Sequence, residues 1–253
     1  MDIPVELLAF LEGQMTATFA VFLRMSAFFS LMPGFGEQSI PTRIKLALSV
    51  MMTVFVSPAV TPTGELPAVT SLIFSEIVTG VALGLMIRLF VLSLQTAGAI
   101  AAQATSLSQL FGGSAAEPLP AMGNILVVGG LTLAVMMGLH IKAAHFFVMS
   151  YDLVPHGVFP NAQMIGQWGV QRVAAAFSLA FSLAAPFIVM SVIYNLALGA
   201  INKAMPQLMV AFVGAPLITA GGLVLLLFSA PMMLHVWVTA MDGFLAAPTK
   251  DTF

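Results

Sequence analysis

Residues 68–104 read AVTSLIFSEIVTGVALGLMIRLFVLSLQTAGAIAAQA, and this stretch decides the fold class. It holds no proline in 37 residues, and its apolar side chains lack the alternation of a half-buried strand. A straight helix of that length measures about 55 Å, whereas the hydrocarbon core of a membrane is about 30 Å thick. The stretch therefore predicts one long helix that tilts strongly, breaks, or stands partly clear of lipid.

The composition around this stretch has the same character. Hydrophobic residues make up 60% of the 253 residues and charged residues 7%, whereas soluble domains carry about 45–50% and about 25%. This predicts a membrane-embedded protein and argues against a soluble enzyme, a nucleic-acid binder or a disordered chain. The net charge of −2 offers no polybasic surface for nucleic acid, and the lack of cysteine excludes disulfides and thiolate chemistry.

Five further apolar runs accompany the first. They cover residues 16–32, 44–60, 121–149, 164–198 and 208–247. Only helices or closed barrels satisfy the backbone in lipid, and runs of this length without period-two alternation indicate helices. We therefore expect an all-α membrane protein with six spanning runs. The Lys and Arg residues near the two sets of ends are too evenly divided to orient it.

Several charged residues lie inside these runs, where each costs at least about 2.5–3.5 kcal/mol at the centre of the bilayer, and four of them are the main cases. They are Arg24, Glu76, Arg88 and Arg172. Glu76 and Arg88 are twelve residues apart, about 120° around a helix and roughly 18 Å along it, so they cannot pair within one straight helix. Each needs a partner on another span or another subunit. Structural pairing or interfacial snorkelling is one interpretation, and an ion or proton relay is the other.

A segment of mostly small residues, 106–120, separates two of the longest apolar runs. Loops of this length without secondary structure are usually functional or disordered, and irregular backbone at membrane depth is tolerated only inside protein or beside water. Phe111 next to Gly112 and Gly113 places a bulky side chain beside a flexible hinge. The segment is either an exposed surface loop or part of a pore.

Catalytic signatures are absent from the sequence. It contains no HExxH, no GxSxG and no GxxxxGK[ST] motif. His140 and His145 are five residues apart, about 140° around a helix, which is poor geometry for sharing a metal. We therefore expect no enzymatic activity, no metal and no cofactor.

Three groups of residues follow one another in a recognisable order. The first is Phe22-Leu23-Arg24-Met25-Ser26-Ala27-Phe28-Phe29, then Pro33-Gly34-Phe35-Gly36 and Ile40-Pro41-Thr42-Arg43. The second is Gly138-Leu139-His140, Ser150-Tyr151 and Pro155-His156-Gly157. The third is Asn195-Leu196-Ala197-Leu198-Gly199, Asn202-Lys203, Pro206-Gln207, Phe212 and Pro216-Leu217. This ordered set, spanning residues 22–217, resembles the FliR family of type III secretion export-gate subunits, which includes injectisome relatives.

The resemblance implies a noncatalytic subunit of the flagellar gate, with the injectisome version as an alternative. It implies long helical hairpins, with a FliP-like part in residues 1–160 joined to a FliQ-like part in residues 161–253. The implied partners are FliP and FliQ in a hetero-oligomeric gate, FlhB, membrane lipid, and the unfolded flagellar subunits that pass through the centre. The implied location is the bacterial inner membrane, as a multi-pass protein at the flagellar basal body.

The resemblance also assigns two sets of site residues. By position, the loop that plugs the pore corresponds to Ser106, Leu107, Ser108, Gln109, Leu110, Phe111, Gly112, Gly113, Ser114, Ala115, Ala116, Glu117, Pro118, Leu119 and Pro120. We assign subunit packing to Arg24, Arg43, Glu76, Arg88, Asn195, Lys203, Pro206 and Gln207. The family usually leads into the loop with Gln-x-Gly, where this chain has Gln103-Ala104-Thr105.

A secondary transporter for a small solute is the alternative from a different class. It would use Glu76 or Arg88 as a coupling group and helix breaks at Pro186 and Pro216 as a binding region. Against it, the two halves of the sequence show no matching pattern of breaks.

Overall fold

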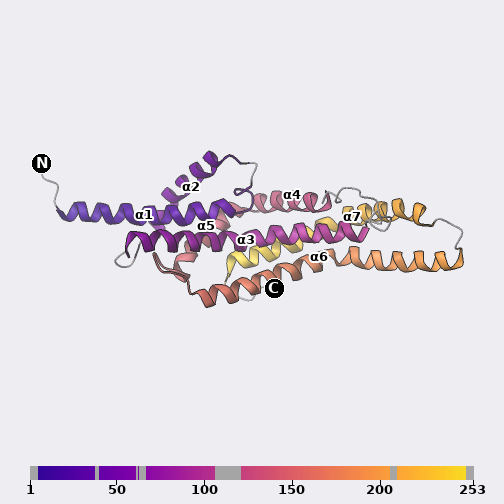
Figure 1. Ribbon diagram of the computed structural model, residues 1–253. Coiled ribbons are helices and arrows are strands. Elements are labelled where there is room, and N and C mark those ends of the chain that lie inside the picture. The colour runs from indigo at the N-terminus through magenta and orange to yellow at the C-terminus, as the bar shows by residue number, and fades with distance from the viewer. Residues whose placement is uncertain are drawn as a thin grey trace. The chain divides into compact units, whose positions relative to one another are not determined.

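The computed structural model describes residues 5–37, 40–60, 62, 67–105, 121–205 and 210–248. Every regular element in these ranges is a helix, which confirms the all-α prediction. The elements are α1 (Val5–Leu31), α2 (Thr42–Val56), the 3-10 turn η1 (Ser57–Ala59), α3 (Val69–Thr105), α4 (Ala121–Met136), α5 (Leu139–Leu153), α6 (Ala162–Ala204) and α7 (Val210–Ala246) (Figure 1).

The proline-free stretch forms the unbroken helix α3 of 37 residues, as its length predicts. The run at 121–149 was predicted as one helix, and this is wrong. It breaks into α4 and α5, which bend by 75° around Gly138. Gly138 has a φ of +82°, a backbone conformation that favours glycine and interrupts the helical hydrogen bonds. Helices α6 and α7 continue through Pro186, Pro216 and Pro231, so the suggested breaks are not seen there.

Four helices of the described residues are long and apolar enough to cross a membrane, or five spans if the bent pair α4–α5 counts as one. The chain is therefore a multi-pass membrane protein. Six spans were expected, and the difference lies in α1, which is not among the candidates.

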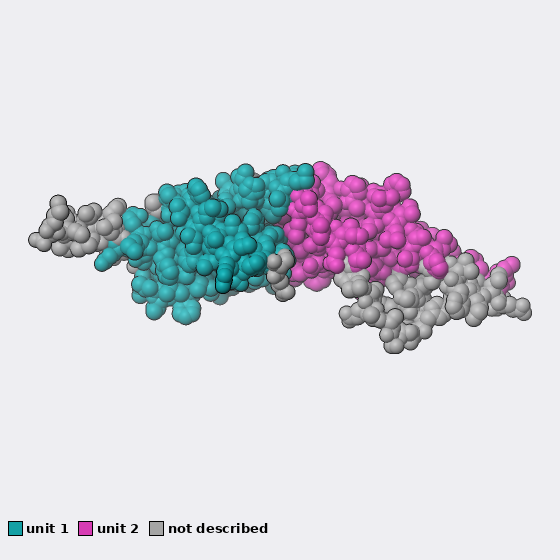
Figure 2. All heavy atoms as spheres, turned by 90° about the horizontal axis from the view of Figure 1, so that it is seen from above, with its two compact units in different colours: residues 1–89, 135–172, 242–252 teal, residues 90–134, 173–241, 253 magenta. Residues whose placement is uncertain are grey.

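The chain divides into two compact units, coloured separately in Figure 2. The first comprises Met1–Leu89, Val135–Arg172 and Asp242–Thr252, and the second comprises Phe90–Ala134 and Val173–Met241 together with Phe253. Both units are assembled from distant parts of the sequence. The expected division after residue 160 follows a different principle, likeness to two partner subunits, and stays a prediction.

The first unit is held together by aromatic packing between helices. The ring of Phe28 on α1 lies 6.3 Å from that of Phe146 and 5.7 Å from that of Phe147, both on α5. Phe146 in turn lies 5.4 Å from Phe244 at the end of α7. All four side chains are almost completely buried. Figure 1 shows α1 running beside the first part of α3, where Gly80 allows the two backbones to approach closely.

The second unit packs around a tryptophan. Trp237 on α7 is fully buried, and its indole nitrogen donates a hydrogen bond of 2.7 Å to the carbonyl oxygen of Phe90 on α3. Gly130 on α4 leaves room for this ring, because a Cβ atom there would lie 3.3 Å from it. Buried Trp usually finds a partner for its N–H, and here that partner is a helix carbonyl.

Candidate functional site: a buried charge cluster

Two of the charges inside the apolar runs meet in the first unit. Arg24 on α1 and Glu76 on α3 form a two-point ion pair, with Nε to Oε2 at 2.6 Å and Nη2 to Oε1 at 3.2 Å. Both side chains are completely buried. The expectation that Glu76 needs a partner on another span is confirmed, and that partner belongs to the same chain.

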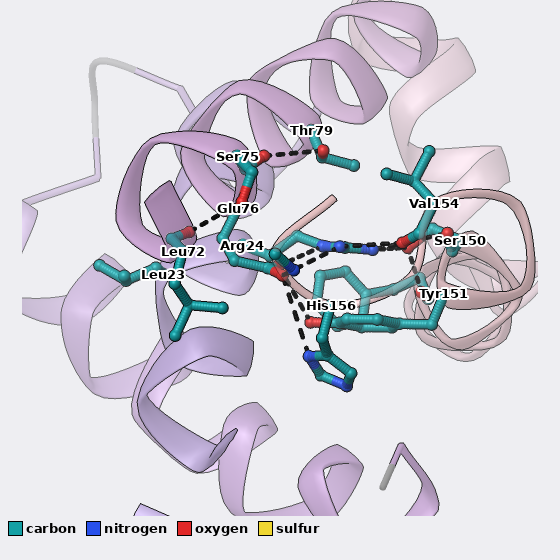
Figure 3. A network of polar contacts seen from close by, with 12 residues as sticks. Leu23, Arg24, Leu72, Ser75, Glu76, Thr79, Ser150, Tyr151, Val154 and His156 are labelled. Atoms are coloured by element: carbon teal, nitrogen blue, oxygen red, sulfur yellow. Dashed lines mark hydrogen bonds and ion pairs between the residues drawn. The ribbon is translucent and has the colours of Figure 1, made fainter. Parts of the chain in front are cut away.

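The segment at the end of α5 completes the hydrogen bonding of Arg24 (Figure 3). The guanidinium Nη1 donates to the hydroxyl of Ser150 at 3.2 Å, and Nη2 donates to the carbonyl of Val154 at 3.0 Å. The ring of Tyr151 lies under the guanidinium, 3.7 Å from its carbon to the ring centroid. A desolvated arginine over an aromatic face gains about 2 kcal/mol, which offsets part of the cost of burial.

The same segment satisfies Glu76. The backbone N–H of Gly157 donates to Oε1 at 2.9 Å, and the Tyr151 hydroxyl lies 3.5 Å from Oε2. The His156 ring packs 4.2 Å from the Tyr151 ring, and its Nδ1 lies 3.8 Å from Glu76. Burial lowers the pKa of His156, although the neighbouring carboxylate opposes this shift. The lowered pKa favours the neutral form of the His156 imidazole. The charges of the buried cluster are then those of Arg24 and Glu76.

The arrangement is suited to structure rather than chemistry. Taking two charges out of water costs several kcal/mol per ion, and only good geometry with extra hydrogen bonds repays it. Both conditions are met here, because α1, α3 and the segment after α5 each contribute to one network. No group of three or more metal-binding side chains occurs in the described part of the chain. A coupling role for Glu76 in solute transport gains no support, because its carboxylate is already paired.

The remaining residues assigned to subunit packing do not join the cluster. Arg43 is exposed at the start of α2, and Arg88 is half-buried on α3. Asn195 and Lys203 are exposed on α6, where the Asn195 amide donates to the Ser191 hydroxyl at 3.2 Å. Pro206, Gln207 and the whole segment 106–120 lie outside the described residues. The packing role and the plug role therefore both stay predictions.

Arg172, another charge inside an apolar run, is also buried. Its Nη2 donates to the carbonyl of Pro248 at 3.0 Å, and its guanidinium carbon lies 4.9 Å from the ring centroid of Phe244. It thereby ties the start of α6 to the end of α7.

Sequence reasoning gave no role to Ser150, Tyr151 and Gly157, although all three belong to the second group of motif residues. Their spacing after an apolar run was the available signal, but the sequence could not show that they surround Arg24. It also missed the ion pair between Lys142 and Asp242, with Nζ to Oδ2 at 2.7 Å, because one hundred residues separate the two.

A second feature is the apolar surface left open by α6 and α7. In the most apolar stretch of each helix, only 28% and 22% of the residues are buried within the chain. Leu196, Leu227 and Phe228 are 70%, 72% and 77% exposed. Apolar surface of this extent indicates contact with lipid or with another protein.

The chain is similar to known bacterial proteins over most of its length. The family model described as "Bacterial export proteins, family 1" matches residues 15–244. The flagellar biosynthetic protein FliR of Caulobacter vibrioides is 36% identical over 224 residues, covering 86% of this chain and 89% of the relative. The proteins of the same name from Escherichia coli and Bacillus subtilis are 28% and 27% identical, over 83% and 82% of this chain and 83% of each relative. Since the family model covers nearly the whole chain, this protein belongs to family 1 of the bacterial export proteins.

Proposed function

We propose that the protein is a noncatalytic subunit of the flagellar type III protein export gate in the bacterial inner membrane. The observation that carries this proposal is the family match over residues 15–244, together with relatives named flagellar biosynthetic protein FliR that align over most of their length. The gate would let unfolded flagellar subunits cross the membrane. The flagellar name of these relatives favours that system over the injectisome.

The open surface of α6 and α7 supports a role within an assembly. Many of the apolar side chains on these two helices are exposed in the single chain. We propose that FliP and FliQ subunits cover part of this surface, with FlhB as a further partner. In this proposal residues 1–160 take the place of a FliP-like subunit and residues 161–253 that of a FliQ-like one.

Six of the residues assigned to subunit packing then divide into two groups. Asn195 and Lys203 are exposed and can contact a neighbour directly. We propose the same role for Pro206 and Gln207, which lie outside the described residues. Arg24 and Glu76 are buried inside the chain, so they would affect assembly by holding α1 and α3 in position. Half-buried Arg88 would find its carboxylate on a neighbouring subunit.

We further propose that residues 106–120 plug the closed channel. A loop of small residues held by weak contacts is displaced at low cost, and deformable Met and Phe side chains can close around varied sequences. Deleting residues 106–120 is expected to leave the assembly intact but to raise the ion conductance of membranes that contain it. Unchanged conductance in an assembled deletion variant would argue against the plug.

Co-expression tests the gate assignment directly. The tagged full chain is expressed with candidate FliP and FliQ subunits, purified in detergent, and imaged by electron microscopy. We expect a stable hetero-oligomer, and we expect the gene to restore swimming in a strain of its own species from which it has been deleted. A chain that stays monomeric beside these partners and transports a small solute would overturn the proposal.

A further inference from the structure

A shallow groove lies between α1 and α2 in the first unit. Its volume is about 520 Å³, within the range of roughly 300–1,000 Å³ that small-ligand pockets occupy. Its walls are mainly apolar, formed by Met15, Phe19 and Phe22 from α1 and by Val50 and Val54 from α2. Met15 and Val54 are 73% and 64% exposed, so the groove is open along one side.

The surroundings of the groove point to lipid. Residues Thr42–Ala59 form a candidate membrane span of which only 17% is buried within the chain. An apolar groove on such a span offers a surface that suits an acyl chain. Because an acyl chain in the bilayer is already out of water, the groove competes with bulk lipid and its apolar walls alone give only a small preference.

The position of Arg43 relative to the groove matches the distance between a lipid phosphate and its acyl chain. Arg43 is exposed, and residues 43, 50 and 54 share one face of α2, because steps of seven and four residues nearly complete whole turns. Along the helix axis Arg43 precedes Val50 by about 10 Å and Val54 by about 16 Å. One leaflet contributes about half of a 30 Å hydrocarbon core, so a phosphate at Arg43 would place its acyl chain beside both valines.

The neighbouring cation is engaged elsewhere. Lys45 donates from Nζ to the carbonyl oxygen of Gly36 at 2.9 Å, which fixes the turn between α1 and α2. No ion pair of Arg43 occurs among the described residues. Its guanidinium is thus open to bind an anion, and guanidinium groups match phosphate oxygens in a two-point geometry.

We propose that the groove between α1 and α2 binds one anionic phospholipid, with its phosphate on Arg43 and one acyl chain along Val50 and Val54. This assigns Arg43 to a lipid headgroup in place of the neighbouring subunit that the family resemblance suggested. The inference needs only the membrane location of the chain and does not depend on the export function.

Photochemical labelling in membranes tests the inference. The full chain, with any partners it retains, is placed in vesicles of phosphatidylethanolamine that contain phosphatidylglycerol with a photoreactive group at the end of one acyl chain. We expect adducts on the peptide with Met15 and Phe19. One arginine beside an anionic lipid corresponds to about a fivefold preference, so Arg43→Gln should reduce these adducts by about that factor. A phosphatidylethanolamine probe with the same tail should label this peptide about fivefold less.

Two neighbouring residues of α2 provide a matched control. Val50 lines the groove and is 47% exposed, whereas Met51 is 49% exposed but is not part of the lining. Val50→Phe fills the groove and should remove most of the adducts, and Met51→Phe should leave them unchanged. The inference is overturned if labelling spreads evenly over α2 or if both lipid probes label the groove equally. It is also overturned if the adducts form on a partner polypeptide instead, because that partner would then cover the groove.

Discussion

The buried cluster of the first unit and the pair of helices α6 and α7 differ in how far the single chain satisfies their side chains. In the cluster, Arg24 and Glu76 are charges that the chain neutralises and hydrogen-bonds by itself. In the helix pair, side chains such as Leu227 and Phe228 are compatible with lipid or protein, but the chain leaves them uncovered. The cluster therefore supports the fold of the single chain, whereas the exposed apolar side chains of α6 and α7 need lipid or another protein to cover them.

The sharpest way to break this contrast is to remove one charge of the cluster. Glu76→Gln leaves Arg24 buried without a counter-charge, which should cost about 3–5 kcal/mol of folding free energy. We expect little folded protein, measured by yield and thermal unfolding in detergent.

Two further variants serve as controls for the Glu76→Gln result. Glu12→Gln changes an exposed carboxylate and should have almost no effect. The double variant Arg24→Met/Glu76→Met should regain part of the loss, because apolar replacement of a whole buried pair is often neutral. Normal yield and stability of Glu76→Gln would show that the ion pair does not hold the helices.

A pair of glycine substitutions compares the same two regions, with smaller expected changes in folding free energy. A Cβ at Gly80 of α3 would overlap the backbone carbonyl of Arg24, whereas none of the atoms around Gly169 of α6 lies within 4 Å of such a Cβ. Gly80→Ala should therefore cost about 1–3 kcal/mol, and Gly169→Ala should gain up to about 1 kcal/mol through helix propensity. Thermal unfolding of the two variants side by side decides this, and equal shifts would contradict it.

Truncating the open surface of α6 and α7 should affect assembly more than stability. Leu227→Ala/Phe228→Ala removes two exposed side chains, so the stability of the chain alone should change by only about 0.5 kcal/mol. Recovery of co-purified gate subunits should fall about tenfold, which corresponds to about 1.4 kcal/mol of binding free energy. Full recovery of the partners would mean that this face contacts lipid.

The smallest expected effect is a pH dependence in the cluster. Burial lowers the pKa of His156, so below about pH 6.5 the unfolded chain takes up a proton there more readily than the folded chain. This contribution to stability is fully present above that pH and decreases as the pH falls toward the lowered value. His156→Phe should flatten the acid side of the melting-temperature profile, whereas His140→Gln, at an exposed position, should not. Identical profiles for His156→Phe and the unaltered protein would contradict the assignment.

Much of the fold could be predicted from the residues themselves. The absence of proline in residues 68–104 predicted an unbroken α3, and the structure confirms it. The break at Gly138 was missed because apolar residues continue on both sides and hide it. The cluster was half predicted, since its charges were recognised as needing partners on other spans. Their pairing depends on contacts between residues 52 and more positions apart, which no local pattern encodes.

The sequence by itself determined that this chain is helical and membrane-embedded, since its composition and run lengths leave no other way to satisfy the backbone in lipid. Its ordered motifs also indicated the family. Only the tertiary structure decided which charges neutralise one another and which apolar faces remain open. The physical reason is that burial and pairing are properties of helices packed together. The same arginine costs several kcal/mol on one isolated helix, and that cost is offset once a carboxylate from another helix pairs with it.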